Sequence, residues 1–400
     1  QSGGLGLMLA QWIVEGEPEL DMFPWDLARF GNWPTKSFVK ERVMDCYSHR
    51  FKIHFPYEER EAGRPVDGRL RPAYQRQKDL GAVFGLNYGW EHPLWFAGRG
   101  VDGREDYGFE RQGWFAPVGE EVTALRNSVG VIDVSNFAKY EIKGPGAREW
   151  LDRIVANNVP HEIGRSCLTP LLGHRGGIAG DFTITMLDED HYWMVGSGMA
   201  ERYHARFWNE IPLPEGTTFT CQTEAWCGFN VAGPNARELL RRLTQADLSN
   251  EAFRFMRSRR ITVAGIDVIA LRVSFTGDLG WELYVPTEQQ LALYDALLEA
   301  GADLDVRPVG GRSLLSLRVE KGYGSWGREY SPEYWPQEVG LERLIKLDKP
   351  EFLGREAYLE IKDKAPREKL VMLEVEVHHN ADASGGEPIF ATDGRPVGRV

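Results

Sequence analysis

The segment EIKGPGAREWLDRI, residues 141–154, decides the fold, because a close copy, NVAGPNARELLRRL, returns at residues 230–243. In each copy a strand-like run ends at glycine, a proline starts a turn with a fixed φ, and Ala-Arg-Glu opens an amphipathic helix. Glu149 and Glu238 lie near the helix N-termini, where a negative charge suits the helix dipole. We therefore predict two related α+β halves around a pseudo-twofold axis. Two coincidental strand–turn–helix units are the alternative.

Each half also contains a glycine-rich turn and a carboxylate. The first is GHRGGIAGDFTIT, residues 173–185, in which Asp181 precedes an alternating strand. The second is SFTGDLGWELYV, residues 274–285, in which Glu282 lies within a strand. A carboxylate among strand-core neighbours costs on the order of several kcal/mol unless it has a partner. We expect both carboxylates to face a shared central cavity and to bind a polar ligand with donor groups; exposed hairpin acids are the alternative.

Composition and charge narrow the class of protein. The chain has 400 residues, enough for two or three domains, and a formal net charge of −12. This acidic balance argues against a nucleic-acid partner or an anionic membrane surface. The apolar runs are far shorter than the roughly 20 residues that span a bilayer, so we expect no transmembrane helix. The four cysteines match no zinc pattern and predict free thiols, with a Cys221–Cys227 disulfide as the less favoured alternative.

The chain divides into four predicted parts. Residues 1–45 resemble the exit of an upstream domain, and residues 46–105 form a central region that ends in a glycine-rich linker. Residues 106–365 are the main body. Residues 366–400 are the last part: from about residue 368 the alternating run KLVMLEVEV predicts a strand that opens a further β-rich domain, and Asp393-Gly394 predicts a hairpin with a type I′ turn. We expect the chain to be part of a longer protein.

The first residues place glycines ahead of a helix. Gly3, Gly4 and Gly6 precede an apolar run from Leu7 to Val14. Glycine lets the backbone approach a ligand closely, and a helix N-terminus favours an anion or a polarised oxygen. We therefore predict a turn at Gly3-Gly4 that faces a ligand.

Taken together, the main-body motifs resemble a known family. GVIDVSNFAKYEIKGPGAREWLD, GGIAGDFTIT, FTGDLGWELYVP and GGRSLLSLRVEKGY follow one another as in the folate-binding aminomethyltransferase domain of the glycine cleavage T-protein. GGLGLMLAQWIVEGEP, WDLARF and GWEHPLWF resemble the dimethylglycine and sarcosine dehydrogenase family, in which an FAD-dependent oxidoreductase is fused to this folate domain. The resemblance implies that residues 1–45 end the oxidoreductase domain, that residues 106–365 are the folate domain, and that residues 366–400 begin a β-barrel domain.

The resemblance also implies a reaction. It is the capture, by tetrahydrofolate, of a one-carbon unit released by oxidative N-demethylation of a methylated glycine-type amine, giving 5,10-methylenetetrahydrofolate. The implied cofactors are tetrahydrofolate and FAD, the latter held mainly by residues outside this chain, because no GxGxxG follows a strand here. The implied partners are the small-molecule amine and an electron-transfer flavoprotein, in the cytoplasm or the mitochondrial matrix.

Five positions match functional residues of the family. Asp181 matches the catalytic aspartate beside folate N5 and N10, and Glu282 matches the glutamate that binds the pterin edge. Arg312 matches an arginine near the folate, with a structural ion pair to Glu320 or Glu342 as the alternative. The glycines at positions 3 and 4 match a turn against the flavin ring.

Three positions depart from the family pattern. Gly180 replaces a frequent Asp, Phe275 a frequent Tyr, and Asp278 a frequent Glu. None is one of the five matched residues, but each bears on folate affinity.

Two other functions remain open at this point. One is a free-standing aminomethyltransferase acting with a lipoyl carrier protein, against which residues 1–97 argue, because a T-protein has no need of them. The other is a non-catalytic folate-binding module. Retention of Asp181 argues against it, since binding alone could rest on Glu282.

Overall fold

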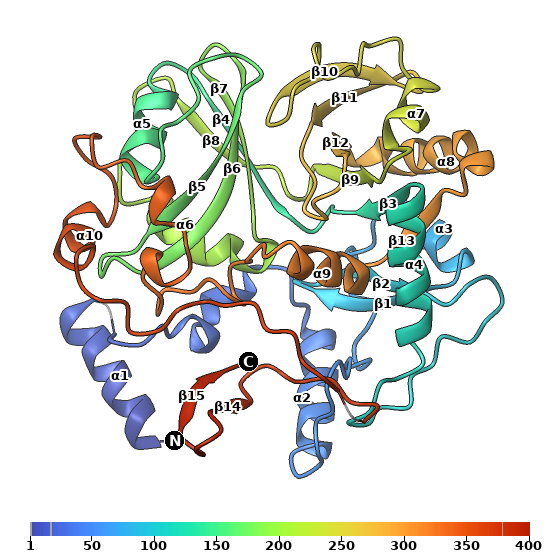
Figure 1. Ribbon diagram of the computed structural model, residues 1–400. Helices are drawn as coiled ribbons and strands as arrows, with labels where there is room; N and C mark the ends of the chain where they lie inside the picture. Colours follow the sequence, from blue (N-terminus) through green and yellow to red (C-terminus); the bar gives the residue numbers. More distant parts are fainter. Residues whose placement is uncertain (1, 17, 378) are drawn as a thin grey trace. The chain divides into compact units, whose positions relative to one another are not determined.

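The computed structural model describes residues 2–16, 18–377 and 379–400, and the chain divides into two compact units (Figure 1). Unit 1 comprises Gln1–Trp33, Phe137–Thr223 and Gly324–Leu370; unit 2 comprises Pro34–Asn136, Glu224–Tyr323 and Val371–Val400. In the described part of the chain, no helix combines the length and the apolar character needed to cross a membrane. All four cysteines are free thiols, as predicted.

Unit 1 is built on a five-stranded antiparallel sheet in the order β5-β6-β7-β4-β8 (Figure 1). Its strands are β4 (Ala138–Lys143), β5 (Ser166–Leu172), β6 (Ile178–Asp188), β7 (His191–Gly196) and β8 (Thr218–Cys221). Its α-helices are α1 (Ser2–Glu15), α5 (Ala147–Ile154), α6 (Glu201–Trp208) and α10 (Arg355–Ile361).

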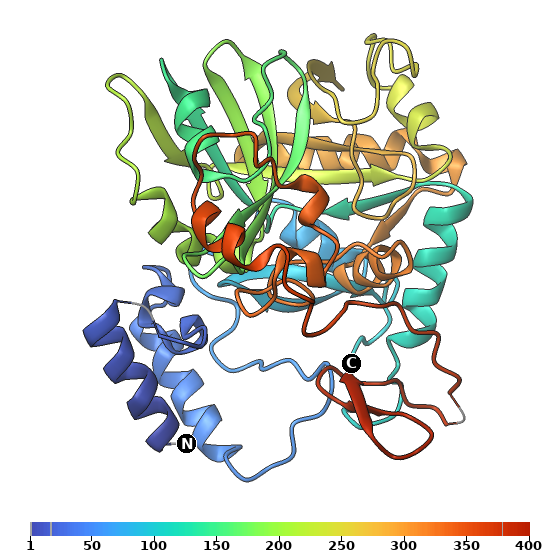
Figure 2. The same cartoon turned by 60° about the vertical axis from the view of Figure 1, so that its left-hand side comes forward.

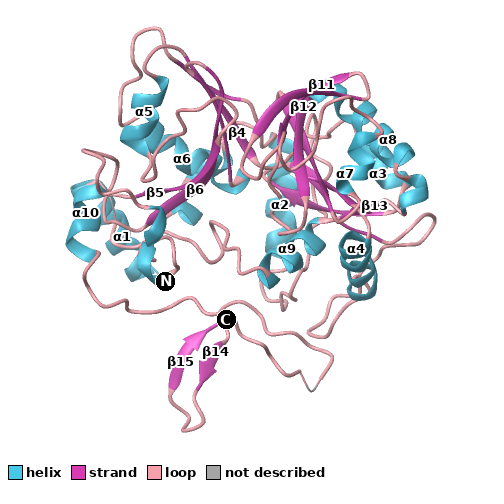
Figure 3. Ribbon diagram, turned by 45° about the horizontal axis from the view of Figure 1, so that its top comes forward, coloured by secondary structure: helices cyan, strands magenta, loops and turns pink. Residues whose placement is uncertain are grey.

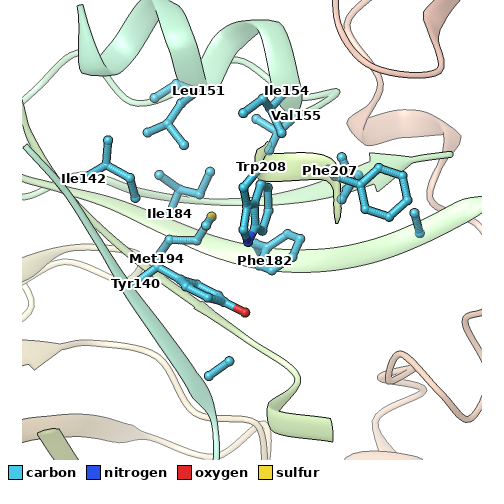
Figure 4. Packing of buried hydrophobic residues seen from close by; sticks show 14 of the residues in the cluster. Tyr140, Ile142, Leu151, Ile154, Val155, Phe182, Ile184, Met194, Phe207 and Trp208 are labelled. Atoms are coloured by element: carbon cyan, nitrogen blue, oxygen red, sulfur yellow. The ribbon is translucent and has the colours of Figure 1, made fainter. Parts of the chain in front are cut away.

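The core of unit 1 lies between this sheet and its helices. Helix α5 buries Ala147, Trp150, Leu151 and Ile154, a spacing that puts all four side chains on one helical face. Figure 4 shows Leu151 and Ile154 over sheet residues such as Ile184. Burying each large apolar side chain contributes about 1.5–3 kcal/mol, so this face anchors the helix on the sheet.

Unit 2 is built on a six-stranded sheet in the order β10-β11-β12-β9-β3-β13, in which only the β3–β13 pair is parallel. Its strands are β3 (Gly130–Asp133), β9 (Trp226–Ala232), β10 (Ser258–Val263), β11 (Ile266–Leu271), β12 (Gly280–Pro286) and β13 (Arg307–Val309). The α-helices are α2 (Lys36–Ser48), α3 (Tyr74–Asp79), α4 (Phe115–Asn127), α7 (Ala236–Arg241), α8 (Gln290–Ala300) and α9 (Gly311–Glu320). Figure 3 shows α7 and α8 beside the large sheet.

Unit 2 also carries two small hairpins. They are β1 (Ala82–Asn87) with β2 (Trp90–Phe96), and β14 (Pro388–Phe390) with β15 (Pro396–Arg399). The second hairpin, red in Figure 2, confirms the turn predicted at Asp393-Gly394. Its predicted type is wrong, because a type I′ turn needs positive φ at both residues and only Gly394, at 83°, has it.

The predicted repeat is confirmed. Unit 1 runs β4–α5–β5–β6–β7–α6 and unit 2 runs β9–α7–β10–β11–β12–α8, and the strand orders β5-β6-β7-β4 and β10-β11-β12-β9 correspond. Gly144 (φ 124°) and Gly233 (φ 127°) end the first strand of each copy. A Cβ at Gly144 would lie 2.3 Å from the Gly216 carbonyl oxygen, and one at Gly233 would lie 2.4 Å from that of Ser128. The turn therefore requires glycine in both copies, and the predicted α+β fold class holds.

The two glycine-rich turns are not equivalent within this repeat. The turn at residues 173–177 joins β5 to β6, whereas the turn at residues 274–279 joins β11 to β12. Since β6 corresponds to β11 and β7 to β12, Asp181 and Glu282 lie on non-equivalent strands. The prediction that Asp181 precedes its strand is wrong, because β6 already begins at Ile178.

The strand predicted from residue 368 is also wrong. Residues 370–377 form no strand, and their apolar side chains are exposed. An alternating pattern yields a strand only where a neighbouring strand satisfies its backbone, and the structure provides none there among the described residues. The four-part domain division stays a prediction.

Candidate functional site

Asp181 is the fourth residue of β6 in unit 1, opposite Pro170 of β5. Its side chain keeps some exposure, but the dense surroundings of the carboxyl group raise its pKa to about 6. A hydrogen bond from the backbone N–H of Trp326 acts in the opposite sense and lowers this pKa. A carboxyl pKa raised this far makes Asp181 a candidate functional group.

The two residues that flank Asp181 in β6, Gly180 and Phe182, face the aromatic core of unit 1. Figure 4 shows Phe182 beside Trp208, and the Phe182 ring also lies 4.6 Å from the imidazole ring of His204. A Cβ at Gly180 would lie 2.8 Å from Nε2 of His204. The space beside Gly180 is thus already filled, which explains why this chain has no side chain where the family pattern has a frequent Asp.

His204 on α6 is a residue that the sequence reasoning missed. Its side chain is fully buried, and burial lowers its pKa to about 3. The imidazole is therefore neutral at physiological pH and packs as an aromatic ring. Nothing in the local sequence ERYHARFW distinguishes it from an exposed helical histidine, because its environment comes from residues far along the chain.

Trp326 packs in the core of unit 1. Its ring lies 4.9 Å from that of Tyr203 and 5.5 Å from that of His204, and its indole Nε1–H donates to the carbonyl oxygen of Ile178 at 3.2 Å. Trp326 is thus a packing residue. Tyr323, which belongs to unit 2, is exposed, and its ring stacks on that of Phe275 with 6.2 Å between the centroids.

Glu282 lies in β12 of unit 2 and is 7% exposed. The Tyr284 hydroxyl, two residues along the same strand and so on the same face, donates to Oε2 of Glu282 at 2.7 Å. Burial and the neighbouring charge of Glu282 raise the pKa of Tyr284 well above its usual value, so the phenol keeps its proton. The exposed-acid alternative is wrong for Glu282, because the carboxylate is buried and bound.

Arg312 lies in the first turn of α9 in unit 2 and is 7% exposed. It forms a bidentate ion pair with Glu105, and its guanidinium lies 5.2 Å from the Tyr57 ring centroid and 5.0 Å from that of Trp114. Glu105 also accepts a hydrogen bond from the indole N–H of Trp95 at 3.0 Å. The guanidinium is therefore already paired and stacked within unit 2.

The ion pair of Arg312 does not have the partners that the sequence suggested. Glu320 pairs instead with Arg126, and Glu342 belongs to unit 1. A pairing between residues 105 and 312 leaves no local signal in the sequence. A folate contact of Arg312 stays a prediction.

Gly3 and Gly4 lie inside α1, which begins at Ser2. The predicted turn ahead of the helix is therefore wrong. No atom lies within 4 Å of a Cβ built at either glycine, so their surroundings in the described chain are open. A contact of these glycines with a flavin ring stays a prediction.

A small cavity of about 100 Å³ lies beside the turn that precedes β12 in unit 2. Phe255, Arg272, Ser274, Asp278 and Tyr323 are among its lining residues. Oδ2 of Asp278 is buried and accepts no hydrogen bond from the described residues. The cavity has room for a few water molecules at most.

These residues do not form one described site. Asp181 belongs to unit 1, whereas Glu282 and Arg312 belong to unit 2, so the shared cavity stays a prediction. Among the described residues, no group of three or more His, Cys, Asp or Glu side chains could hold a metal ion.

Comparison with protein families identifies two regions. Residues 73–349 match the model of the GCVT N-terminal domain, and residues 15–67 match the model of the FAD dependent oxidoreductase central domain. The first match covers both copies of the repeat together with Asp181, Glu282 and Arg312.

Curated relatives agree with these matches. The chain is 34% identical to mouse dimethylglycine dehydrogenase over 100% of its own length and 46% of the relative. It is 32% identical to human sarcosine dehydrogenase over 100% of its length and 47% of the relative. An aminomethyltransferase from Halothermothrix orenii is 30% identical over 75% of this chain and 78% of the relative. The chain thus spans about half the length of the two dehydrogenases.

A solved structure confirms the fold. The glycine cleavage system aminomethyltransferase T from Bartonella henselae superposes with a TM-score of 0.68 and 23% sequence identity, over 82% of this chain and 84% of that chain. At this identity the likeness concerns the fold alone.

Proposed function

The chain belongs to the GCVT N-terminal domain family, and we propose that it captures a one-carbon unit on tetrahydrofolate, giving 5,10-methylenetetrahydrofolate. The one-carbon unit would come from oxidative N-demethylation of a methylated glycine-type amine. The match over the whole chain to dimethylglycine and sarcosine dehydrogenases supports this source.

Oxidation of the amine is proposed to need FAD. The match of residues 15–67 to an oxidoreductase central domain supports a flavin-dependent partner reaction in the same polypeptide. Residues outside this chain would hold most of the flavin, and an electron-transfer flavoprotein would accept the electrons. We place the reaction in the cytoplasm or, in a eukaryote, in the mitochondrial matrix.

The ionisable carboxyl group of Asp181 is the observation that carries the proposal. Bound tetrahydrofolate supplies the nucleophilic nitrogen that takes up the one-carbon unit. A carboxylate at Asp181, with its pKa near 6, is mostly ionised at neutral pH. Its charge would orient the reacting amine and stabilise positive charge in the transition state, an effect worth about 2.7–4 kcal/mol for preorganised groups.

Glu282 fits the binding role. The pterin edge offers an N–H and an NH₂ as parallel donors, which one carboxylate can accept together, at about 1.5–3 kcal/mol for each charge-assisted bond. The carboxylate is already desolvated, and the Tyr284 hydroxyl fixes Oε2 in place at 2.7 Å. Little reorganisation would then be needed when a ligand binds.

The experiment follows the fate of the one-carbon unit in the full-length polypeptide, with dimethylglycine or sarcosine as amine and saturating tetrahydrofolate. Asp181→Asn keeps the size of the side chain and removes its charge. We expect amine oxidation to continue, methylenetetrahydrofolate formation to fall by about 100-fold or more, and free formaldehyde to accumulate. Asp188→Asn, at the exposed end of the same strand, is the control and should leave the product ratio unchanged. An unchanged ratio for Asp181→Asn would refute the catalytic role.

A free-standing aminomethyltransferase acting with a lipoyl carrier protein is the second candidate. The H. orenii relative, of which 78% is covered, favours it, whereas the match of residues 15–67 favours the oxidative reaction. If the full-length polypeptide binds no flavin and oxidises neither amine, the second candidate replaces the first.

A further inference from the structure

We propose that the loop Gly324–Tyr330 holds Asp181 in its reactive position, and that Trp326 is the positioning residue through which it acts. The inference rests on the proposed role of Asp181 in one-carbon capture. All residues of this arrangement belong to unit 1.

Hydrogen bonds within the loop Gly324–Tyr330 join its two ends. The Gly327 N–H donates to the Tyr330 carbonyl at 2.8 Å, and the Tyr330 N–H donates to the Ser325 carbonyl at 3.2 Å. The Ser325 N–H donates to the carboxylate of Glu329 at 3.0 Å. A Cβ on Gly324 would lie 2.3 Å from the Tyr330 ring, so the two ends of the loop are in direct contact. These bonds fix the backbone of Trp326 between them.

Trp326 then fixes the loop on strand β6. Its indole N–H donates to the Ile178 carbonyl at 3.2 Å, while the Ile178 N–H donates to the Tyr334 carbonyl at 3.1 Å. The segment after α9 therefore binds both backbone groups of the first residue of β6. Three residues further along the strand, the backbone N–H of Trp326 is near enough to the Asp181 carboxyl group to lower its pKa. One residue thus contacts the strand at its start and at the reactive side chain.

Among the described residues, no cationic side chain stabilises the ionised carboxyl group of Asp181. In the described part of the chain, Asp181 forms no ion pair with Lys, Arg or His, and its neighbours Pro170, Gly180 and Phe182 carry no charge. Tyr330 is the titratable group beside it, and burial together with the Asp181 charge raises the pKa of that phenol, which therefore stays neutral. The Trp326 N–H is consequently the main outside group that favours the ionised carboxyl group.

The loop also explains why Asp181 can titrate near neutral pH without a cationic partner. Desolvation favours the protonated acid, and the main-chain N–H groups of Trp326 and of Asp181 itself oppose it. A shift of Trp326 away from β6 would weaken the effect of its N–H on the carboxyl group. The carboxyl pKa would then rise further, and less of the group would be ionised at neutral pH.

The test is Trp326→Phe in the full-length polypeptide. This variant keeps an aromatic ring in the core but loses the indole donor to Ile178, which frees the loop to move. Trp150→Phe is the matched control. Trp150 is 2% exposed, belongs to the same core, and its indole N–H donates to the Ile211 carbonyl at 2.8 Å, away from Asp181. Both variants lose one buried indole hydrogen bond and should lose similar thermal stability.

The measurement is the pH profile of the ratio of methylenetetrahydrofolate to formaldehyde, with dimethylglycine and saturating tetrahydrofolate. We expect the midpoint to move up by at least half a pH unit in Trp326→Phe and to stay in place in Trp150→Phe. An unchanged midpoint in folded Trp326→Phe, or an equal shift in both variants, overturns the positioning role. An Asp181→Asn variant that traps the one-carbon unit normally refutes the proposed catalytic role of Asp181 itself, and a polypeptide that binds no flavin and oxidises neither amine refutes the proposed function, so the failures are distinguishable.

Discussion

The carboxylates of the two halves of the repeat differ in their strand, in their exposure and in the group that stabilises them. Asp181 lies on β6, keeps some exposure, and is held by a backbone N–H from a loop outside the repeat. Glu282 lies on β12, is 7% exposed, and is held by the hydroxyl of Tyr284 on its own strand. The shared topology therefore provides the scaffold, while each carboxylate is stabilised by contacts that the other half lacks.

This difference fits a division of labour. The Asp181 carboxyl group depends on one outside donor and titrates near pH 6, so its charge responds to small changes around it. The Glu282 carboxylate is bound within a sheet, where strand pairing with Asn230 and Leu271 fixes the backbone on both sides. A group that handles changing charge must be adjustable, whereas a group that binds a ligand benefits from rigidity.

The largest predicted effect tests the feature that both halves share. Gly144→Ala and Gly233→Ala each place a methyl group within 2.4 Å of a backbone oxygen, at a φ above 120°. We expect each to destabilise the protein by at least about 4 kcal/mol, so that little folded protein is recovered. Gly265→Ala is the control, since its φ is also positive but no atom lies within 4 Å. It should cost only about 1 kcal/mol in denaturant unfolding. Full stability of either first variant would contradict the equivalence of the two turns.

The equivalence of these turns could be predicted from the sequence, and the carboxylate contacts could not. The Gly-Pro turn and the helix after it are local signals, so the repeat and the fold class follow from residues 141–154 and 230–243 alone. The influence of Trp326 on the pKa of Asp181 joins residues far apart through a main-chain N–H, which no side-chain pattern encodes. The strand predicted from residue 368 failed for a related reason, because strand formation depends on a distant partner.

The next effect concerns binding by Glu282. Glu282→Ala removes the proposed acceptor of two pterin donors, and we expect tetrahydrofolate affinity to fall by about 30- to 1000-fold, or roughly 2–4 kcal/mol, in calorimetry. Glu288→Ala, which removes an exposed carboxylate soon after the same strand, should leave affinity unchanged. The corresponding Asp181→Asn variant should bind tetrahydrofolate nearly as tightly as the parent, because the role proposed for Asp181 is in the reaction. Equal losses of affinity in the two carboxylate variants would contradict the division of labour.

A smaller effect appears in the pH dependence of stability. The pKa of Asp181 is raised from 3.8 to about 6, so the folded protein binds this proton more tightly than the unfolded chain does. The resulting stability is fully present below about pH 4 and is lost as the pH rises through about 6. Allowing for partial exposure, we expect a loss of about 2 kcal/mol over this interval. Asp181→Asn should remove that part of the slope in urea unfolding, whereas Asp188→Asn should retain it.

The smallest predicted effect is a difference in stability between two Tyr→Phe variants. The two tyrosines are buried on corresponding strands, but their hydroxyls donate to different kinds of acceptor. Tyr192 on β7 donates its hydroxyl to the neutral carbonyl of Pro160 at 3.1 Å, whereas Tyr284 on β12 donates to the carboxylate of Glu282 at 2.7 Å. Both rings are almost fully buried, so Tyr→Phe removes one hydroxyl from a similar environment in each half.

Because a hydrogen bond to a charged group is stronger, Tyr284→Phe should cost about 2 kcal/mol of stability and Tyr192→Phe about 1 kcal/mol. Denaturant unfolding of the two single variants measures this difference directly. In addition, Tyr284→Phe should weaken tetrahydrofolate binding, since Glu282 loses the contact that fixes its orientation, and Tyr192→Phe should not. Equal costs with unchanged affinity would show that Tyr284 is only a core residue, and that Glu282 is held in place by its strand alone.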